Sequence, residues 1–484
     1  MNTDVWLGTE WIAGDGSAFD NTCPATGETV WTGCAASLAQ VATAVEVAKR
    51  AFADWSIRPQ AERTAVLEAY AEALKQRIDE IAVAISRDMG KVTWEARGEA
   101  AAMVGKIAIS INAQLERAGD RTQEAGFGTL ALTHRPHGVM AVFGPFNFPG
   151  HLPNGHIVPA LLAGNTCVFK PSELAPSVTK IMVDAFLEAG LPEGCLCVVQ
   201  GGRDTGSALL AADIDGLLFT GSAQTGTFFH KYFGGRPDVI LALEMGGNNP
   251  LIIWDTNDID AAADIAAQSA FLTTGQRCSC ARRLIVPDGD IGDMLIEAVV
   301  ERARGLRIGA WNEDDVFMGP LVSEDAAQKA VEFQMGLSKA GGKPLRRLKR
   351  LDRGWGFVSA GVIDMTAARN VPDEELFGPL LQVYRVPNFE TALKTANATR
   401  YGLAGGLISD RDDLWQTARL RMRVGILNRN RPTAGASGAM PFGGPGLSGN
   451  FRPGAYYAAD YCAWPQASQI AEKAERLSAQ GFPK

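Results

Sequence analysis

Residues 139–145 read Val-Met-Ala-Val-Phe-Gly-Pro, and a short apolar run that ends in a Gly-Pro turn is typical of a buried strand. Three more apolar runs, each closed by a turn, follow at residues 166–169, 197–200 and 217–220. A segment predicted as a helix separates the first two of these and ends at residues 190–192, Gly-Leu-Pro. Short apolar strands that alternate with helices indicate a parallel sheet with crossover helices. The sequence therefore predicts an α/β fold.

A second region with the same alternation starts after Glu244. Residues 250–254 and 284–286 are predicted as strands, and residues 259–272 between them as a helix. We expect two α/β lobes with a boundary near residues 246–247, Gly-Gly. The chain has 484 residues, which at about 150 residues per domain predicts roughly three domains.

The segments at the two ends of the chain differ from these lobes. Residues 37–40 form a capping box before a helical apolar pattern, and a second helix is predicted from Gln60 through Ser86, with Gly90 as its stop signal. These helices are expected to pack over the rest of the chain. The last residues, 445–484, are rich in Gly, Pro, Tyr and Ala, which predicts a tail exchanged between subunits.

The composition excludes several classes of protein. Hydrophobic residues make up 46% and charged residues 21%, which is ordinary for a globular chain and not for a disordered or collagen-like one. The net charge of −8 disfavours a protein whose main task is to hold nucleic acid. No apolar run approaches the roughly 18 residues of a membrane span, and the N-terminus lacks the pattern of a signal peptide. We expect a cytoplasmic protein.

The cysteines and histidines do not predict a metal site. The eight cysteines are scattered and form no C-x-x-C pair, and the pairs Cys195/Cys197 and Cys278/Cys280 have the wrong spacing for common zinc sites. The five histidines include no H-E-x-x-H motif.

Two turns at predicted strand ends are candidates for binding a nucleotide. Residues 221–226, Gly-Ser-Ala-Gln-Thr-Gly, precede a helix, and glycines there let the backbone approach a phosphate. A plain strand-to-helix turn accounts for this spacing equally well. Residues 170–173, Lys-Pro-Ser-Glu, close another strand, where open α/β sheets bind ligands. Glu173 would repel a 2′-phosphate, which favours NAD over NADP; a surface loop with a serine cap is the alternative.

Three residues have the chemistry of a catalytic site. Cys278 lies in a glycine-containing turn, and the neighbouring Arg277, Arg282 and Arg283 are expected to lower its thiol pKa; an ordinary buried cysteine is the alternative. Glu244, before a Gly-Gly turn, is a candidate general base or a cap for the next element.

Asn147 lies among aromatic residues in a turn. Its amide is suited to donate to an oxyanion if it points into a cleft, although asparagine is also common in turns for local reasons.

The order of these motifs is more specific than any one of them. The chain resembles the NAD(P)-dependent aldehyde dehydrogenase superfamily over essentially its whole length. The resemblance rests on residues 146–149, 170–173, 219–222, 243–247, 275–278, 374–379 and 441–444. Within the superfamily, further segments resemble the group that oxidises N-succinylglutamate 5-semialdehyde in arginine catabolism. These segments are residues 148–156, 243–250, 278–283 and 455–461.

This resemblance implies a role for each motif. Cys278 would be the nucleophile, Glu244 the general base, and Asn147 with the backbone N–H of Cys278 the oxyanion hole. The aldehyde would pass through a cysteine thiohemiacetal and a thioester that water hydrolyses. The residues expected to bind NAD are Lys170 and Glu173 at the adenosine ribose, Gly221, Ser222 and Gly226 at the pyrophosphate, and Glu375 and Phe377 at the nicotinamide ribose.

The resemblance also implies the domains. We expect a Rossmann-like NAD-binding domain at residues 1–119 and 139–246, and an α/β catalytic domain at residues 247–444. A small β oligomerisation region would comprise residues 120–138 and 445–484 and form a homodimer or homotetramer.

The substrate tunnel departs from many relatives. Gly155 takes the place of a bulky aromatic, and His151 lies one turn earlier on the same helical face, which suggests a wide, polar tunnel for a long acidic aldehyde. Arg429 and Arg431 replace the Trp and Lys that are usual in the succinylglutamate group, and together with Arg277 they are candidates for binding substrate carboxylates.

Two other interpretations of the function remain open. One is the same chemistry on another acidic or medium-chain aldehyde. The other is an inactive structural or binding homologue, against which the presence of Cys278, Glu244 and Asn147 argues. Glu244 also argues against a CoA-acylating enzyme.

Overall fold

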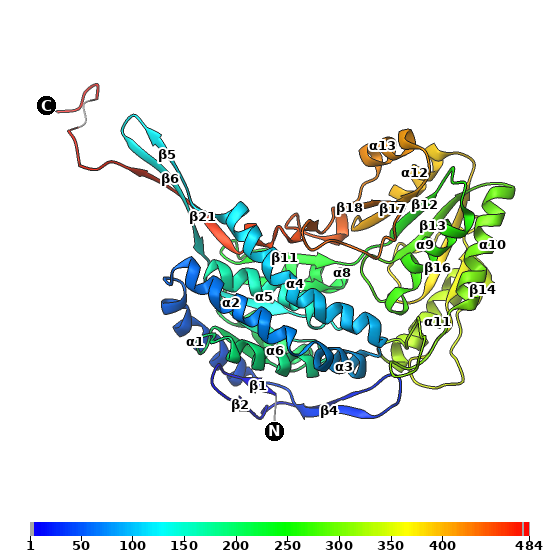
Figure 1. The fold of residues 1–484 in the computed structure, drawn as a ribbon, viewed down its shortest axis with the longest axis horizontal. Coiled ribbons are helices and arrows are strands. Elements are labelled where there is room, and N and C mark those ends of the chain that lie inside the picture. Colours follow the sequence, from blue (N-terminus) through cyan, green and yellow to red (C-terminus); the bar gives the residue numbers. More distant parts are fainter. Residues whose placement is uncertain (1–3, 477–478, 484) are drawn as a thin grey trace.

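Two α/β lobes and a projecting β arm make up the computed structural model, which describes residues 4–476 and 479–483 (Figure 1). The first lobe contains the N-terminal helices and the first sheet, and the second lobe contains the second sheet with its own helices. No helix among the described residues is long and apolar enough to cross a membrane.

The first sheet has seven strands, and the five neighbouring strands from β11 at one edge to β9 are parallel. In spatial order the strands are β11 (Ile240–Met245), β10 (Gly216–Gly221), β7 (Val139–Phe143), β8 (Thr166–Lys170), β9 (Leu196–Val199), β1 (Val5–Trp6) and β2 (Trp11–Ile12). Every residue of β7, β8 and β9 is buried, as expected for strands covered on both faces. The predicted α/β fold is confirmed.

Helices cover both faces of this sheet. They are α1 (Leu38–Trp55), α2 (Gln60–Lys75), α3 (Ile78–Met89), α4 (Thr93–Ala118), α5 (His151–Ala163), α6 (Ser177–Glu188), α7 (Arg203–Ala211) and α8 (Ala223–Tyr232). The capping box at Ser37 is present, and Gly90 ends α3 in the left-handed conformation, with φ of 77°. The prediction of one helix from Gln60 through Ser86 is wrong. The chain leaves the helix at Arg77, whose side chain caps α2 by donating to the carbonyl of Ala73, without a Gly or Pro to signal the break.

The second sheet also has seven strands and is parallel except at one edge. Its order is β14 (Lys343–Arg346), β15 (Gly361–Asp364), β16 (Leu380–Val386), β13 (Ala281–Pro287), β12 (Asn249–Ile253), β17 (Ala404–Ile408) and β18 (Ile426–Arg429). The helices of this lobe are α9 (Ile259–Phe271), α10 (Asp290–Gly305), α11 (Glu324–Lys339), α12 (Phe389–Asn397) and α13 (Asp412–Arg421). The first sheet ends at Met245 and the second begins at Asn249, on either side of the Gly-Gly turn.

Three antiparallel strands form the arm that projects from the first lobe in Figure 1. They are β5 (Arg121–Ala125), β6 (Gly128–Pro136) and β21 (Ala463–Ile470), and β21 pairs with β6 along its whole length. A separate hairpin is formed by β3 (Ala18–Thr22) and β4 (Thr29–Cys34).

The chain before β21 does not project with the arm, in contrast to the tail predicted from residue 445 onward. It contains β19 (Pro441–Phe442), β20 (Gly454–Ala455) and α14 (Ala458–Tyr461), and α14 packs on α4 and α5. Gly449 forms a β-bridge with Glu244 at the end of the first sheet. This segment therefore closes over the carboxyl edge of the first sheet, because the partner of its backbone is β11.

Candidate active site

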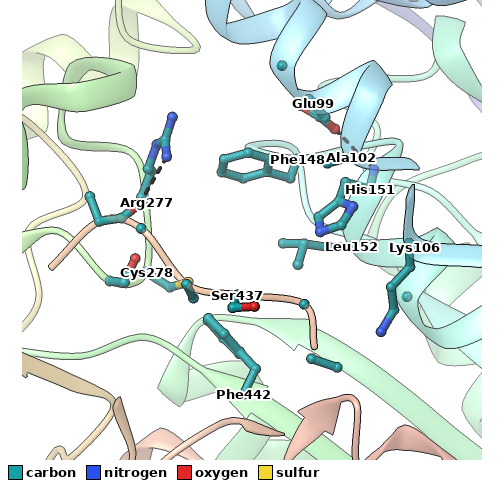
Figure 2. Close-up of a pocket in the computed structure, with 18 of the residues that line it drawn as sticks. Glu99, Ala102, Lys106, Phe148, His151, Leu152, Arg277, Cys278, Ser437 and Phe442 are labelled. Carbon is teal, nitrogen blue, oxygen red and sulfur yellow. Dashed lines mark hydrogen bonds between the residues drawn. The ribbon is translucent and has the colours of Figure 1, made fainter. Parts of the chain in front are cut away.

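A cavity of about 390 Å³ lies where the two lobes meet, between α4, α5 and the turn that carries Cys278 (Figure 2). One face of α4 lines it with residues at helical spacing. These are Glu95, Gly98, Glu99, Ala102 and Lys106. Opposite α4 lie Cys278 and the segment 434–438, with Phe442 and Glu244 at the side. The cavity therefore collects residues from both lobes and from the closing C-terminal segment.

The turn that carries Cys278 is tightly held. It follows a 3₁₀ turn (Leu272–Gly275) in which Thr273 and Thr274 have positive φ values of 52° and 58°, an uncommon conformation for β-branched residues. The carboxylate of Glu95 accepts from Thr273 N at 3.1 Å and from its hydroxyl at 2.7 Å. Asn249 Nδ2 donates to the carbonyl of Cys278 at 2.7 Å. These contacts fix the position of the thiol between the lobes.

Burial raises the pKa of the Cys278 thiol to about 12, and the nearby Glu375 and Glu244 add to this effect. The prediction that flanking arginines lower this pKa is wrong. Arg282 opposes the increase only in part and forms an ion pair with Glu375, while Arg283 donates to backbone carbonyls. The thiol is therefore protonated at neutral pH, and a base must remove its proton before the sulfur can attack.

Glu244 provides a carboxylate suited to that task. It lies near the end of β11, and burial raises its pKa to about 7, against the attraction of Lys106. Thr220 donates to Oε2 at 3.4 Å, and a Cβ added at Gly454 would overlap Oε1. The carboxyl group is thus buried, weakly hydrogen-bonded and able to exchange a proton near neutral pH.

A chain of polar side chains lies behind Glu244. The ring of His156 is 3.0 Å from the Thr220 hydroxyl through Nε2 and 3.1 Å from the Tyr461 hydroxyl through Nδ1. Burial lowers the pKa of His156 to about 3, so the ring is neutral at pH 7. These polar side chains support the Glu244 carboxyl group through Thr220, and none of them places a charge beside it.

Asn147 is buried in the turn between β7 and α5. Its Nδ2 donates to the carbonyl of Gln276 at 2.9 Å, two residues before Cys278. The carbonyl of Asn147 accepts from Lys91 Nζ at 2.5 Å, and Lys91 pairs with Glu99 at 2.6 Å with both side chains fully buried. A buried ion pair therefore holds the Asn147 amide against the turn that carries the thiol.

The residues predicted to bind the adenosine half of NAD lie at the carboxyl edge of the first sheet. Lys170 ends β8, donates to the carbonyl of Gly201 at 2.6 Å and lies 3.6 Å from Glu173, whose side chain is half exposed. Ser222 caps α8 by accepting from Thr225 N at 3.2 Å. An ammonium, a half-exposed carboxylate and a helix N-terminus at this edge fit a ribose and a pyrophosphate.

The two glycines of the predicted phosphate turn have packing roles. A Cβ at Gly226 would overlap the side chain of Met245, so this glycine lets α8 pack closely on β11. A Cβ at Gly221 would overlap the ring of Phe219. Packing therefore accounts for both glycines without a phosphate.

Glu375 and Phe377 bring a segment of the second lobe to the end of the first sheet. Glu375 Oε1 accepts from Arg282 at 3.2 Å, and a Cβ at Gly246 would overlap Oε2. Phe377 packs edge-on against Phe146, with ring centroids 5.8 Å apart. Both predicted nicotinamide-ribose residues thus lie beside the turn between the lobes.

The predicted substrate residues divide into two groups. His151, Gly155 and Arg277 line the cavity. Burial lowers the pKa of His151 to about 4, and its Nδ1 has no partner among the described residues, so a neutral polar ring faces the cavity. Arg277 is paired with Glu95 at 2.6 Å.

Arg429 and Arg431 do not line the cavity, which corrects the prediction that they bind the substrate. Arg429 ends β18 at the edge of the second sheet, donates to Asp412 on α13 at 2.7 Å and lies over the ring of Trp415. Arg431 is exposed.

Several polar residues of the site were missed from the sequence. A row of charged residues at a spacing of four begins with Lys91, just before α4, and continues with Glu95 and Glu99 in its first two turns. Lys106 follows on the same face of the helix. A charged row at this spacing normally predicts a solvent-exposed helix face. The row is buried here because it supports the two turns that carry Asn147 and Cys278.

Comparison with known proteins defines the class. Residues 11–466 match the model of the aldehyde dehydrogenase family, and the chain belongs to this family.

Within the family, the chain is similar to relatives of one kind. It is 55% identical over 474 residues to N-succinylglutamate 5-semialdehyde dehydrogenase 2 of Caulobacter vibrioides, covering 97% of this chain and 96% of the relative. It is 52% identical over 468 residues to the N-succinylglutamate 5-semialdehyde dehydrogenase of Burkholderia multivorans, covering 96% of each.

Solved structures share the fold. An indole-3-acetaldehyde dehydrogenase in complex with NAD⁺ has a TM-score of 0.91 at 28% identity and covers 97% of both chains. A 1-pyrroline-5-carboxylate dehydrogenase of Thermus thermophilus has a TM-score of 0.91 at 30% identity, covering 96% of this chain and 92% of the other.

Proposed function

We propose that the protein oxidises N-succinylglutamate 5-semialdehyde to N-succinylglutamate with NAD. The observation that carries the proposal is one cavity that holds a thiol, Cys278, and a buried carboxyl group with a pKa near 7, Glu244, in a chain more than half identical to enzymes named for this aldehyde. Thiol and base together are what an aldehyde oxidation through a thioester requires.

The chain's own residues account for the steps at the thiol. Glu244 accepts the proton of Cys278, and the sulfur adds to the aldehyde carbon. The Asn147 amide and the backbone N–H of Cys278 stabilise the oxyanion. NAD held by the residues named below would supply the hydride acceptor for the former aldehyde carbon, and loss of the hydride would leave a thioester on Cys278. Glu244 releases the first proton to solvent and then takes a proton from the water that attacks the thioester. The departing thiolate regains this proton from Glu244, which restores the thiol.

The NAD site is assigned to residues at the carboxyl edge of the first sheet. Lys170 and Glu173 would hold the adenosine ribose, and Ser222 at the start of α8 would contact the pyrophosphate. Glu375 and Phe377 would position the nicotinamide ribose next to Cys278. The half-exposed Glu173 carboxylate repels a 2′-phosphate, which supports NAD over NADP.

The assembly and location are part of the same proposal. An NAD-binding domain at residues 1–119 and 139–246 and a catalytic domain at residues 247–444 are supported by the two sheets. The arm exposes Leu130, Trp464 and Ile470, which supports its use in a homodimer or homotetramer. The ordinary globular composition and the net charge of −8 support a cytoplasmic enzyme that acts on a small-molecule substrate.

The direct test is NADH production from a set of aldehydes at equal concentration. We expect the highest kcat/KM for N-succinylglutamate 5-semialdehyde, compared with the unacylated semialdehyde and with aliphatic aldehydes. A preference for another acidic aldehyde would change the substrate and leave the chemistry, and a preference for an uncharged aldehyde would contradict the assignment.

The width of the cavity at Gly155 gives a second test. A Cβ at Gly155 would meet only the Lys106 stem, at 3.7 Å, so the position has room for a larger side chain that would narrow the cavity. The variant Gly155→Trp is expected to lose activity on N-succinylglutamate 5-semialdehyde before it loses activity on a short aldehyde. Equal losses on both aldehydes would contradict a role in admitting a long substrate.

A further inference from the structure

Lys106 is a buried cation in the cavity that has no partner among the described residues. It lies on the face of α4 that lines the cavity, and the residue is only 3% exposed. Its Nζ has no hydrogen-bond partner in the described part of the chain, and none of the carboxylates there lies within ion-pair distance of it. Figure 2 shows the side chain extending into the cavity, beyond His151 and on the side away from Arg277.

The other cations near the cavity are already neutralised. Arg277 forms its ion pair with Glu95, and Lys91 forms its ion pair with Glu99. His151 also faces the cavity, but it is neutral at pH 7 because burial lowers its pKa to about 4. Among the described residues that line the cavity, Lys106 therefore offers the one positive charge without an anionic hydrogen-bonding partner.

An unpartnered ammonium in a buried position is unfavourable in the empty protein. Burial lowers the pKa of Lys106 to about 8, so the group is still mostly protonated at pH 7. An anion that enters the cavity stabilises such a group, because the anion supplies the missing hydrogen-bond acceptor and the missing negative charge. The net charge of the chain is −8 and repels a dicarboxylate, so binding such a substrate requires a local cation.

We propose that Lys106 binds a carboxylate of the aldehyde substrate and thereby selects acidic aldehydes. The proposal rests on the proposed function, and it names a residue that determines the substrate class. The cavity has space for the carboxylate because Gly155, directly beside the lysine stem, has no side chain. His151 Nδ1, which has no partner among the described residues, adds a polar atom to the same wall.

A second role for Lys106 must be separated from this one. Lys106 also attracts Glu244 and lowers its pKa, so removing the lysine changes the base as well. A change in the base slows every aldehyde alike, whereas loss of a carboxylate contact slows only aldehydes that carry a carboxylate. The ratio of kcat/KM between an acidic aldehyde and its uncharged counterpart isolates the contact.

The test compares glutarate semialdehyde with pentanal, which has the same five-carbon chain without the carboxylate, and adds N-succinylglutamate 5-semialdehyde. In Lys106→Met, the ratio of acidic to uncharged kcat/KM is expected to fall by at least about tenfold, mainly through KM, as for loss of a charged hydrogen bond. Lys106→Arg keeps the charge and is expected to restore part of the ratio.

A surface variant serves as the control. Lys75→Met removes a lysine from the exposed face of α2 and should leave the ratio unchanged. Methionine is unbranched and apolar, so it suits the buried helical position of Lys106, and thermal unfolding of each variant checks that the fold is intact. An unchanged ratio in a folded Lys106→Met, whether total activity falls or not, would overturn the proposal.

The experiment distinguishes failure of the Lys106 proposal from failure of the proposed function. If wild-type protein oxidises glutarate semialdehyde but not N-succinylglutamate 5-semialdehyde, the named substrate is wrong while the ratio still tests Lys106. If wild-type protein prefers pentanal to both acidic aldehydes, the proposal for Lys106 is overturned as well.

Discussion

Glu244 and Glu375 are two buried carboxylates that both raise the pKa of the Cys278 thiol, but their surroundings differ. Each lies where a glycine leaves space, Gly454 for Glu244 and Gly246 for Glu375. Glu375 has an ion pair with Arg282 and lies close to the N–H of Gly247. Glu244 has one long hydrogen bond, from Thr220.

This difference separates a carboxylate that holds a position from one that exchanges a proton. Burial raises the pKa of Glu375 as well, but its ion pair with Arg282 and the backbone N–H of Gly247 oppose this rise and restrict its movement. Glu244 lacks such partners among the described residues, so its charged and neutral forms have similar free energies near pH 7. Two like residues beside one thiol thus suit different tasks.

The substitution Glu244→Gln tests the comparison most strongly. Without a base, the Cys278 thiol is not deprotonated and the thioester is not hydrolysed, so both the burst of NADH and the steady turnover are expected to fall, the turnover by at least about 100-fold. Rapid-mixing measurements of NADH formation separate the two phases. The matched variant Glu375→Gln should keep hydrolysis and raise KM for NAD. Near-normal turnover in Glu244→Gln would remove its role as the base.

The two glycines offer a matched pair of smaller changes. In Gly454→Ala the new methyl group displaces the Glu244 carboxylate, and in Gly246→Ala it displaces that of Glu375. We expect Gly454→Ala to lower kcat by about 10- to 100-fold, as for a misplaced general base. Gly246→Ala should act chiefly on KM for NAD. Steady-state kinetics for both substrates decides, and identical effects of the two variants would break the comparison.

The pH dependence of turnover reports the same difference. Glu244 must be ionised to accept a proton, and its pKa is raised to about 7, so kcat should rise with pH and level off above 7. Below that pH, each unit is expected to cost about tenfold in kcat. The acidic limb should persist in Glu375→Gln. A limb at about pH 4–5, the ordinary range of a glutamate, would contradict the raised pKa of Glu244.

The smallest effect is expected at Arg429, which lies away from both carboxylates. Its guanidinium is held by Asp412 on the surface of the second lobe. Exposed ion pairs of this kind contribute about 0–1 kcal/mol to stability. Arg429→Gln should therefore have little effect on stability. Because Arg429 does not line the cavity, KM for N-succinylglutamate 5-semialdehyde should change less than about twofold. A large increase in KM would restore the prediction made from the sequence.

Local sequence patterns correctly predicted the central strands and several helix ends. Apolar runs closed by turns located the central strands, and the capping box at Ser37 and the glycine at position 90 located helix ends. The break at Arg77 was missed because it has no Gly or Pro and depends on how α2 and α3 each pack on α4 and α6. Arg429 was misplaced because sequence does not show which way an edge strand directs a side chain.

The site was harder to predict than the fold for an electrostatic reason. The arginines beside Cys278 were expected to lower its pKa, but the sequence does not show that Arg282 is paired or that desolvation of the half-buried thiol outweighs the arginine. Lys106 was missed because a lysine on a helix is normally solvated. Both depend on long-range contacts that decide which charges lie in water.

Helix α4 has a consequence for changing the enzyme's substrate. Its first turns, with Glu95 and Glu99, hold the two turns that carry Cys278 and Asn147, while Ala102 and Lys106 follow on the face that lines the cavity. With Lys106 as the proposed carboxylate ligand, alignment of the reacting groups and recognition of the substrate lie in successive turns of one helix. Substitutions in the later segment can redirect the enzyme to other aldehydes while the earlier segment keeps the reacting groups aligned, which makes α4 a natural target for engineering substrate range.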